Sequence, residues 1–214
     1  MLAVTEPGKK KPSEYSYFDG DIYIGVGFLS VTELEKEFTH PNAFFWARGS
    51  AKATKLLYDP RGVLRKIMFR WKKTAPSHQL LQESLWDAYH NIIEYSGKLR
   101  NGWLKHNEYL TRYSARVLAG HVERAIIALN GLSIISENYL WHQILNAEKR
   151  PRHIGTDYPL ALGIKGTRNT SKVYRSTMRM CREILRLIRD EIGEKAKHAR
   201  FRALLAEPLE NHGL

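Results

Sequence analysis

Residues 171–192 read SKVYRSTMRMCREILRLIRDEI, and their pattern predicts the most regular helix of the chain. Basic residues recur in this stretch at steps of three and four, a spacing that places them on one face of a helix. Apolar residues, among them Met178, Cys181 and Leu185, fall on the broad arc behind that face. A helix that buries the apolar arc must present the basic face to solvent or to a partner. The predicted basic face consists of Lys172, Arg175, Arg179, Arg182, Arg186 and Arg189.

The whole chain is basic, with a formal net charge of +12 over 214 residues. Hydrophobic residues make up 43% of the sequence, which is enough for a packed core, so a disordered chain is excluded. Surplus charge of this size opposes compaction, and an anionic partner would relieve it. The composition therefore favours nucleic acid, either RNA or DNA, as the partner, together with other protein subunits. An anionic membrane surface is the second candidate for such a partner. No apolar run approaches the length that crosses a membrane, so we expect a soluble chain, and the favoured set of partners includes no membrane.

The sequence contains one cysteine, Cys181, and an intrachain disulfide is therefore impossible. This fits a reducing compartment, and a cytoplasmic location is expected. Zinc sites built from paired cysteines are excluded, and no histidine or carboxylate cluster has the spacing of metal ligands. We expect neither a metal nor a cofactor.

The sequence predicts a mainly α protein in three parts. Residues 1–14 carry three consecutive lysines and are expected to form a flexible basic tail. Residues 15–75 are expected to form a small α+β portion, and residues 76–214 a bundle of four to five helices. The boundary between these two portions is placed at Thr74-Ala75-Pro76, because apolar residues recur with the helical period after it.

Two hairpins and a short helix are expected in the α+β portion. Asp19-Gly20 lies between runs of β-forming residues and predicts the first hairpin. Thr32 and Glu35 have the capping-box spacing and predict the start of the short helix. The turn signature at residues 58–62 favours a second hairpin, although residues 63–73 also fit helical spacing.

The pattern delimits four helices in the bundle portion, and a break of the last one at Gly193 would give a fifth. They span residues 77–96, with Gly97 as a C-terminal cap, then 103–130, 132–149, and 170 to about 205, where Thr170 is the expected N-cap. The connection at residues 150–170 is long and rich in proline and glycine, and connections of this length are often functional.

A second basic stretch covers residues 52–73, where Asp59 is the only acid. Phe69 and Trp71 alternate with the cations, a combination typical of single-stranded nucleic-acid grooves. A half-buried strand with one charged face is the structural alternative. The candidate phosphate contacts in this stretch are Arg61, Arg65, Lys66, Arg70, Lys72 and Lys73.

One short motif admits a catalytic interpretation. Arg100-Asn101 is followed at residue 106 by a histidine, and the sequence resembles the R-N-x(3–5)-H motif of HEPN-family ribonucleases. The resemblance implies a helical bundle that cleaves RNA without metal. His106 would then act as acid or base, Arg100 would stabilise the phosphate, and Asn101 would give polar support.

Three hypotheses about function follow. The favoured one is a non-catalytic nucleic-acid-binding protein that follows the phosphate backbone as a subunit of a larger nucleoprotein complex. The second is a metal-independent HEPN-like ribonuclease of a toxin or antiviral-defence type. The third is a protein–protein scaffold whose arginines meet an acidic partner.

Overall fold

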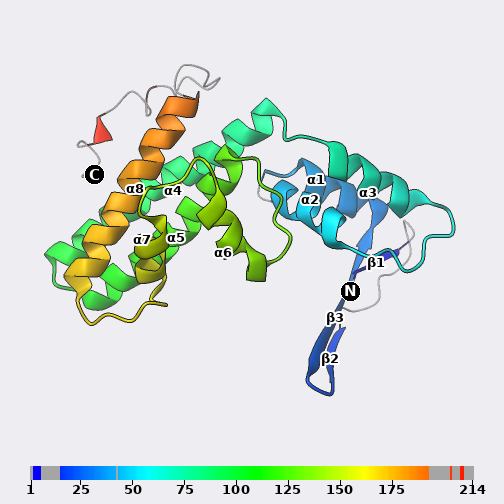
Figure 1. Ribbon diagram of the computed structural model, residues 1–214, viewed down its shortest axis with the longest axis horizontal. Helices are drawn as coiled ribbons and strands as arrows, with labels where there is room; N and C mark the ends of the chain where they lie inside the picture. The colour runs from blue at the N-terminus through cyan, green and yellow to red at the C-terminus, as the bar shows by residue number, and fades with distance from the viewer. Residues whose placement is uncertain (1, 6–14, 42, 193–202, 204–207, 210–214) are drawn as a thin grey trace. The chain divides into compact units, whose positions relative to one another are not determined.

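The structure is a computed structural model that describes residues 2–5, 15–41, 43–192, 203, 208 and 209. Over these residues the protein is mainly α, with eight helices and a small antiparallel hairpin near the N-terminus (Figure 1). The prediction of a mainly α protein is confirmed. The chain divides into two compact units, Met1–Thr74 and Ala75–Leu214, which are described separately below.

The first unit combines a three-stranded sheet with three helices. Its elements are β1 (Leu2–Thr5), β2 (Tyr15–Asp19), β3 (Ile22–Ser30), α1 (Val31–Thr39), α2 (Phe44–Ala53) and α3 (Val63–Lys73). Strand β3 is central, with β1 parallel on one side and β2 antiparallel on the other. The first hairpin is confirmed, since Asp19 pairs with Ile22 and the intervening Gly20 has a φ of 59°. The tail prediction is wrong for Leu2–Thr5, which form β1, and residues 6–14 lie outside the described residues.

Helix α1 begins two residues earlier than the sequence pattern predicted. The capping box is formed by Ser30 and Glu33, not by Thr32 and Glu35. The Ser30 amide donates to the Glu33 carboxylate over 2.8 Å, and the Glu33 amide donates to the Ser30 hydroxyl over 3.3 Å. Ser30 and Glu33 have the same capping-box spacing as Thr32 and Glu35. The box forms at Ser30 because strand β3 ends at that residue.

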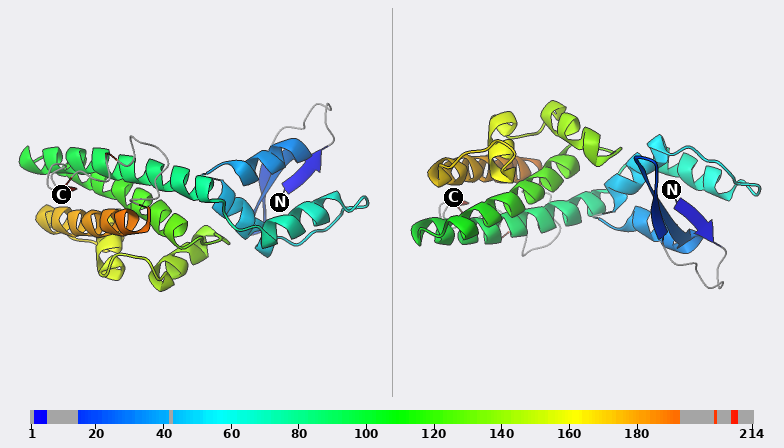
Figure 2. Two further views of the ribbon diagram at one scale, coloured as in Figure 1. Left: turned by 90° about the horizontal axis from the view of Figure 1, so that it is seen from above. Right: turned by 90° about the horizontal axis from the view of Figure 1, so that it is seen from below.

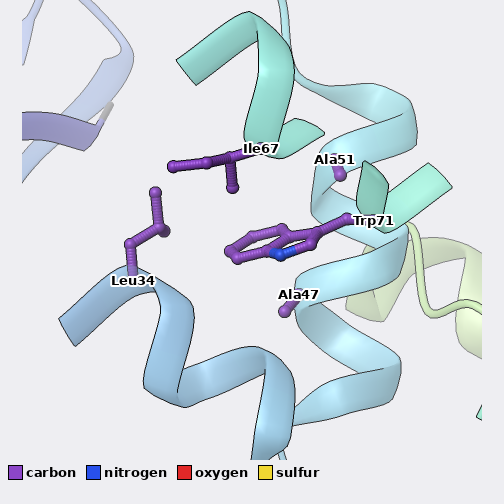
Figure 3. Packing of buried hydrophobic residues seen from close by; sticks show 5 residues of the cluster. All are labelled: Leu34, Ala47, Ala51, Ile67 and Trp71. Carbon is purple, nitrogen blue, oxygen red and sulfur yellow. The ribbon is translucent and has the colours of Figure 1, made fainter. Parts of the chain in front are cut away.

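The predicted second hairpin is wrong, because residues 63–73 form helix α3. The turn before it is present, with the Gly62 amide donating to the Asp59 carbonyl over 3.1 Å. The helix forms because Ile67 and Trp71, four residues apart, are both buried on one face. Trp71 packs with Leu34 of α1, Ala47 and Ala51 of α2, and Ile67 of α3 (Figure 3). Its ring also stacks on Phe38 with 4.9 Å between ring centroids.

The second unit contains five helices in its described part. They are α4 (His78–Leu104), α5 (Glu108–Leu129), α6 (Glu137–Asn146), α7 (Ile154–Leu162) and α8 (Thr170–Ile192). Helices α4 and α5 form a long hairpin, and α8 lies against both of them (Figures 1 and 2). Helix α7 packs on α5 and α8, whereas α6 contacts α5.

Several predicted helix ends differ from the structure. Helix α4 continues through Gly97, because its buried face includes Leu99 and Gly102 beyond that residue. Helix α6 is shorter than residues 132–149. The expected connection at 150–170 contains α7, which buries Ile154, Tyr158 and Ala161 at helical spacing. The prediction for 170–205 is confirmed as far as Ile192, and residues 193–202 lie outside the described residues.

Candidate nucleic-acid interface

Helix α8 presents its predicted basic face as the sequence pattern indicated. Its buried side includes Met180, Cys181, Ile184 and Leu185, so the opposite side carries the cations. Five of the six basic residues are exposed, and Arg189 is half-buried. The helix N-cap is Asn169 and not Thr170, because the Asn169 side chain accepts from the Lys172 amide over 3.0 Å.

Arg179 is occupied by an interaction within the fold. Its Nε and Nη2 atoms donate to the two carboxylate oxygens of Asp157 on α7, over 2.9 and 2.6 Å. The Asp157 side chain is only 2% exposed, whereas that of Arg179 is 49% exposed. The Asp157 hydrogen bonds raise the pKa of Arg179, whose guanidinium stays charged in any case. Arg179 therefore fastens α7 to α8, and phosphate binding is a less suitable role for it.

Two further groups on this side of α8 have partners in the fold. Arg189 Nε donates to the Tyr89 hydroxyl of α4 over 3.1 Å. Glu183, the acid within the basic face, accepts from the Arg152 amide over 2.6 Å. These contacts join α8 to its neighbours on either side. Because of its contact with Tyr89, Arg189 is not counted among the cations available to a ligand.

Four basic residues of α8 remain exposed without an ion pair to another described residue. We call them the α8 row. They extend over about 21 Å at a rise of 1.5 Å per residue. The α8 row consists of Lys172, Arg175, Arg182 and Arg186.

Helix α3 of the first unit carries the second basic surface. Arg70 pairs with Glu35 of α1 over 2.6 Å, and Arg61 also has an interaction within the fold. Asp59 accepts from the Arg65 amide over 2.9 Å, so its carboxylate satisfies the first turn of the helix. Four cations of α3 are exposed and form no ion pair with another described residue: Arg65, Lys66, Lys72 and Lys73.

The two aromatic residues of this stretch have different places in the structure. Trp71 is 3% exposed and belongs to the core of the first unit. Phe69 is 60% exposed, and the Lys73 Nζ atom lies 4.2 Å from its ring centroid. The expected pair of base-stacking residues is therefore reduced to Phe69.

The HEPN-like residues lie at the end of a helix and not at the start of one. Arg100 and Asn101 belong to the last turn of α4, and His106 follows the helix with a φ of 52°. The His106 amide donates to the Trp103 carbonyl over 3.1 Å, and the Asn107 amide donates to the Gly102 carbonyl over 2.8 Å. This is the hydrogen-bond pattern of a Schellman motif, in which glycine usually occupies the left-handed position. The backbone at His106 is explained by helix termination.

His106→Gly is expected to raise the free energy of unfolding by roughly 0.5–1 kcal/mol, because glycine adopts positive φ without strain. Chemical denaturation followed by circular dichroism measures the change. His106→Ala, which keeps the strain and removes the imidazole, serves as the control and should give no increase. A loss of stability in His106→Gly would show that the imidazole, and not the backbone, stabilises the turn.

Neither the single cysteine nor a metal cluster offers a site for chemistry in the part of the chain that the structure describes. Cys181 is buried, and burial raises the pKa of its thiol to about 12, which keeps it protonated and unreactive. No group of three or more His, Cys, Asp or Glu side chains among the described residues could hold a metal ion. None of the described helices is sufficiently long and apolar to span a bilayer.

Sequence reasoning missed Asp157, the partner of Arg179. A signal was present, because Asp157 is the only charged residue in the apolar segment IGTDYPLAL. A carboxylate placed among residues that must be buried requires a cation or several hydrogen-bond donors. The identity of that cation could not be derived, because 22 residues separate the two partners.

Comparison with known proteins does not identify a family for this chain. No protein-family model matches the chain, and no curated protein matches it significantly.

Proposed function

We propose that this protein is a non-catalytic nucleic-acid-binding protein and a subunit of a larger nucleoprotein complex. The observation that carries the proposal is the α8 row, defined above by four exposed cations on one helix face. Side chains that serve the fold are paired with acids or hydroxyls, as Arg179 and Arg189 are. The cations of the α8 row form no ion pair with another described residue, so they are suited to an external polyanion.

The geometry of the row suits the phosphate backbone better than base edges. Phosphates of one strand of a duplex follow each other at about 3.4 Å along the axis, so a row of about 21 Å spans roughly six of them. Contacts to phosphates position a protein and carry no sequence information. Binding is therefore expected to be weakly dependent on sequence and strongly dependent on salt.

The salt dependence can be predicted from the number of contacts. If the four cations of the α8 row each neutralise one phosphate of a duplex, the slope of log K against log salt is about −3.6. Raising the salt from about 50 to 200 mM then lowers the affinity roughly 100-fold. Contacts from α3 would make the slope steeper. Fluorescence anisotropy with a labelled oligonucleotide at several salt concentrations measures this slope.

The variant Arg182→Glu/Arg186→Glu tests the α8 row directly. It should bind at least 10-fold more weakly and reduce the magnitude of the salt slope by about 2. Its matched control is Lys36→Glu/Arg116→Glu, which changes the net charge equally at exposed positions outside both basic surfaces. Equal losses in the two variants would show that only the overall charge matters and would contradict the proposal.

The same assay separates binding from cleavage. A binding protein should leave RNA intact during prolonged incubation in EDTA. Cleavage that disappears in His106→Ala would instead support the HEPN-like hypothesis. Oligonucleotides that fail to bind even at low salt would favour a scaffold with an acidic protein partner.

A further inference from the structure

We infer that the exposed face of α3 binds single-stranded nucleic acid, with Phe69 stacking on a base and the surrounding cations holding the adjacent phosphates. The inference rests on the proposed function and specifies a strand class that the α8 row does not determine. It is carried by the arrangement of one exposed ring and four cations on a single helix.

The position of Phe69 on the helix is the first observation. At about 100° per residue, Arg65 and Lys72 fall on one side of Phe69, and Lys66 and Lys73 fall on the other. All four cations are exposed, and the ring itself is 60% exposed. The face opposite is buried through Ile67 and Trp71, so this side of α3 is fixed toward solvent.

The charge balance of α3 is the second observation. Two acids that contact α3 are already engaged by other groups of the helix, since Asp59 accepts from the Arg65 backbone amide and Glu35 pairs with Arg70. Neither of them offers the remaining four side chains an ion pair. Lys73 instead rests over the Phe69 ring at 4.2 Å. A cation on a ring face is a weak contact at an exposed site, and a base can replace it.

The chemistry of the ring decides between strand classes. Bases in a duplex are stacked on each other and offer their edges in the grooves, whereas bases in a single strand expose their faces. A phenylalanine ring has no hydrogen-bonding group with which to read an edge. It can contribute through its face, and stacking of this kind tolerates any sequence.

Phe69 differs in its surroundings from the exposed aromatic residues of the hairpin. Phe18 and Tyr23 are also exposed, but they pair with each other on the hairpin, with ring centroids 5.4 Å apart. Strands β2 and β3 contain no lysine or arginine. A base stacked there would have no cation on the same hairpin to hold its phosphate.

The test compares Phe69→Leu with the unchanged protein on two probes of equal length, an unstructured oligouridylate and an RNA duplex. Phe69→Leu should weaken binding to the single strand roughly 10-fold, the lower part of the range for loss of one stacked base. Binding to the duplex should change less than twofold. Phe69→Trp, which retains a stacking face, should restore binding to the single strand.

Phe18→Leu is the matched control, because it makes the same substitution at an exposed ring on a hairpin whose strands carry no lysine or arginine, and it should leave both affinities unchanged. Equal weakening on both probes, or no weakening on the single strand, would overturn the inference. If the unchanged protein binds oligonucleotides but Phe69→Leu has no effect, the inference fails and the proposed function stands. Binding to anionic vesicles but to neither oligonucleotide would overturn both.

Discussion

Gly102→Ala is expected to lower the free energy of unfolding of the second unit by about 2 kcal/mol. A Cβ atom at this position would lie 2.9 Å from the Thr111 backbone nitrogen and 3.2 Å from the Leu110 carbonyl carbon. These are backbone atoms of α5, which cannot rotate away as a flexible side chain would. Overpacking in a tight interior costs roughly 1–3 kcal/mol, and the better helix propensity of alanine offsets only part of it.

Gly97→Ala in the same helix is the matched control. A Cβ atom at Gly97 meets no atom within 4 Å, so the substitution should stabilise the helix by roughly 0.5–1 kcal/mol. Denaturant unfolding of the two variants should therefore shift in opposite directions. If both variants were stabilised, the close approach of α4 and α5 at Gly102 would be contradicted.

The two glycines also show which parts of the fold could be predicted from the sequence. Glycine is permissive at a helix end and tolerated in a helix interior, so the residue alone does not decide between a cap and a close contact. The sequence pattern placed the end of the helix at Gly97. The actual end is determined by Gly102 and His106, through hydrogen bonds and a contact with α5. Helix termination here depends on tertiary packing that a local pattern does not contain.

Features set by local chemistry were predicted well. The hairpin at Asp19-Gly20 follows from the backbone freedom of one glycine between β-forming residues. Helix α8 follows from the period of its apolar and basic residues. The prediction for residues 63–73 was ambiguous, because a short stretch of apolar and basic residues fits both the strand period and the helix period. Burial of Trp71 against α1 and α2 resolved the ambiguity.

The sequence predicted which helix faces carry the cations, but it did not predict which of these cations remain available to a ligand. Helical spacing correctly placed five of six cations of α8 at exposed positions. It did not reveal that Arg179 and Arg189 contact other helices, because such contacts depend on the packing of α7 and α4. The same limit applied to Phe69 and Trp71, which are two residues apart and lie on opposite sides of their helix.

Some basic residues of α8 stabilise the fold and others remain exposed, and this difference predicts a second large effect on stability. Arg179→Ala is expected to lower the free energy of unfolding by about 2–3 kcal/mol, because it leaves the Asp157 carboxylate buried without its cation. The cost should stay below that of a fully buried pair, since the Arg179 side chain is 49% exposed and water can reach part of the site. Hydrogen exchange should show the loss most strongly in α7, which this pair joins to α8.

Arg182→Ala provides the control, because it removes the same charge three residues later on the same helix. Arg182 is exposed and forms no ion pair with another described residue, so its loss should change stability by less than about 0.5 kcal/mol. In a background of Asp157→Ala, Arg179→Ala should also cost little, since no carboxylate is then left unpaired. Equal destabilisation by Arg179→Ala with and without Asp157 would contradict the coupling. Arg182→Ala should weaken nucleic-acid binding at almost unchanged stability, and that combination would separate the residues of α8 that hold the fold from those that remain available to a ligand.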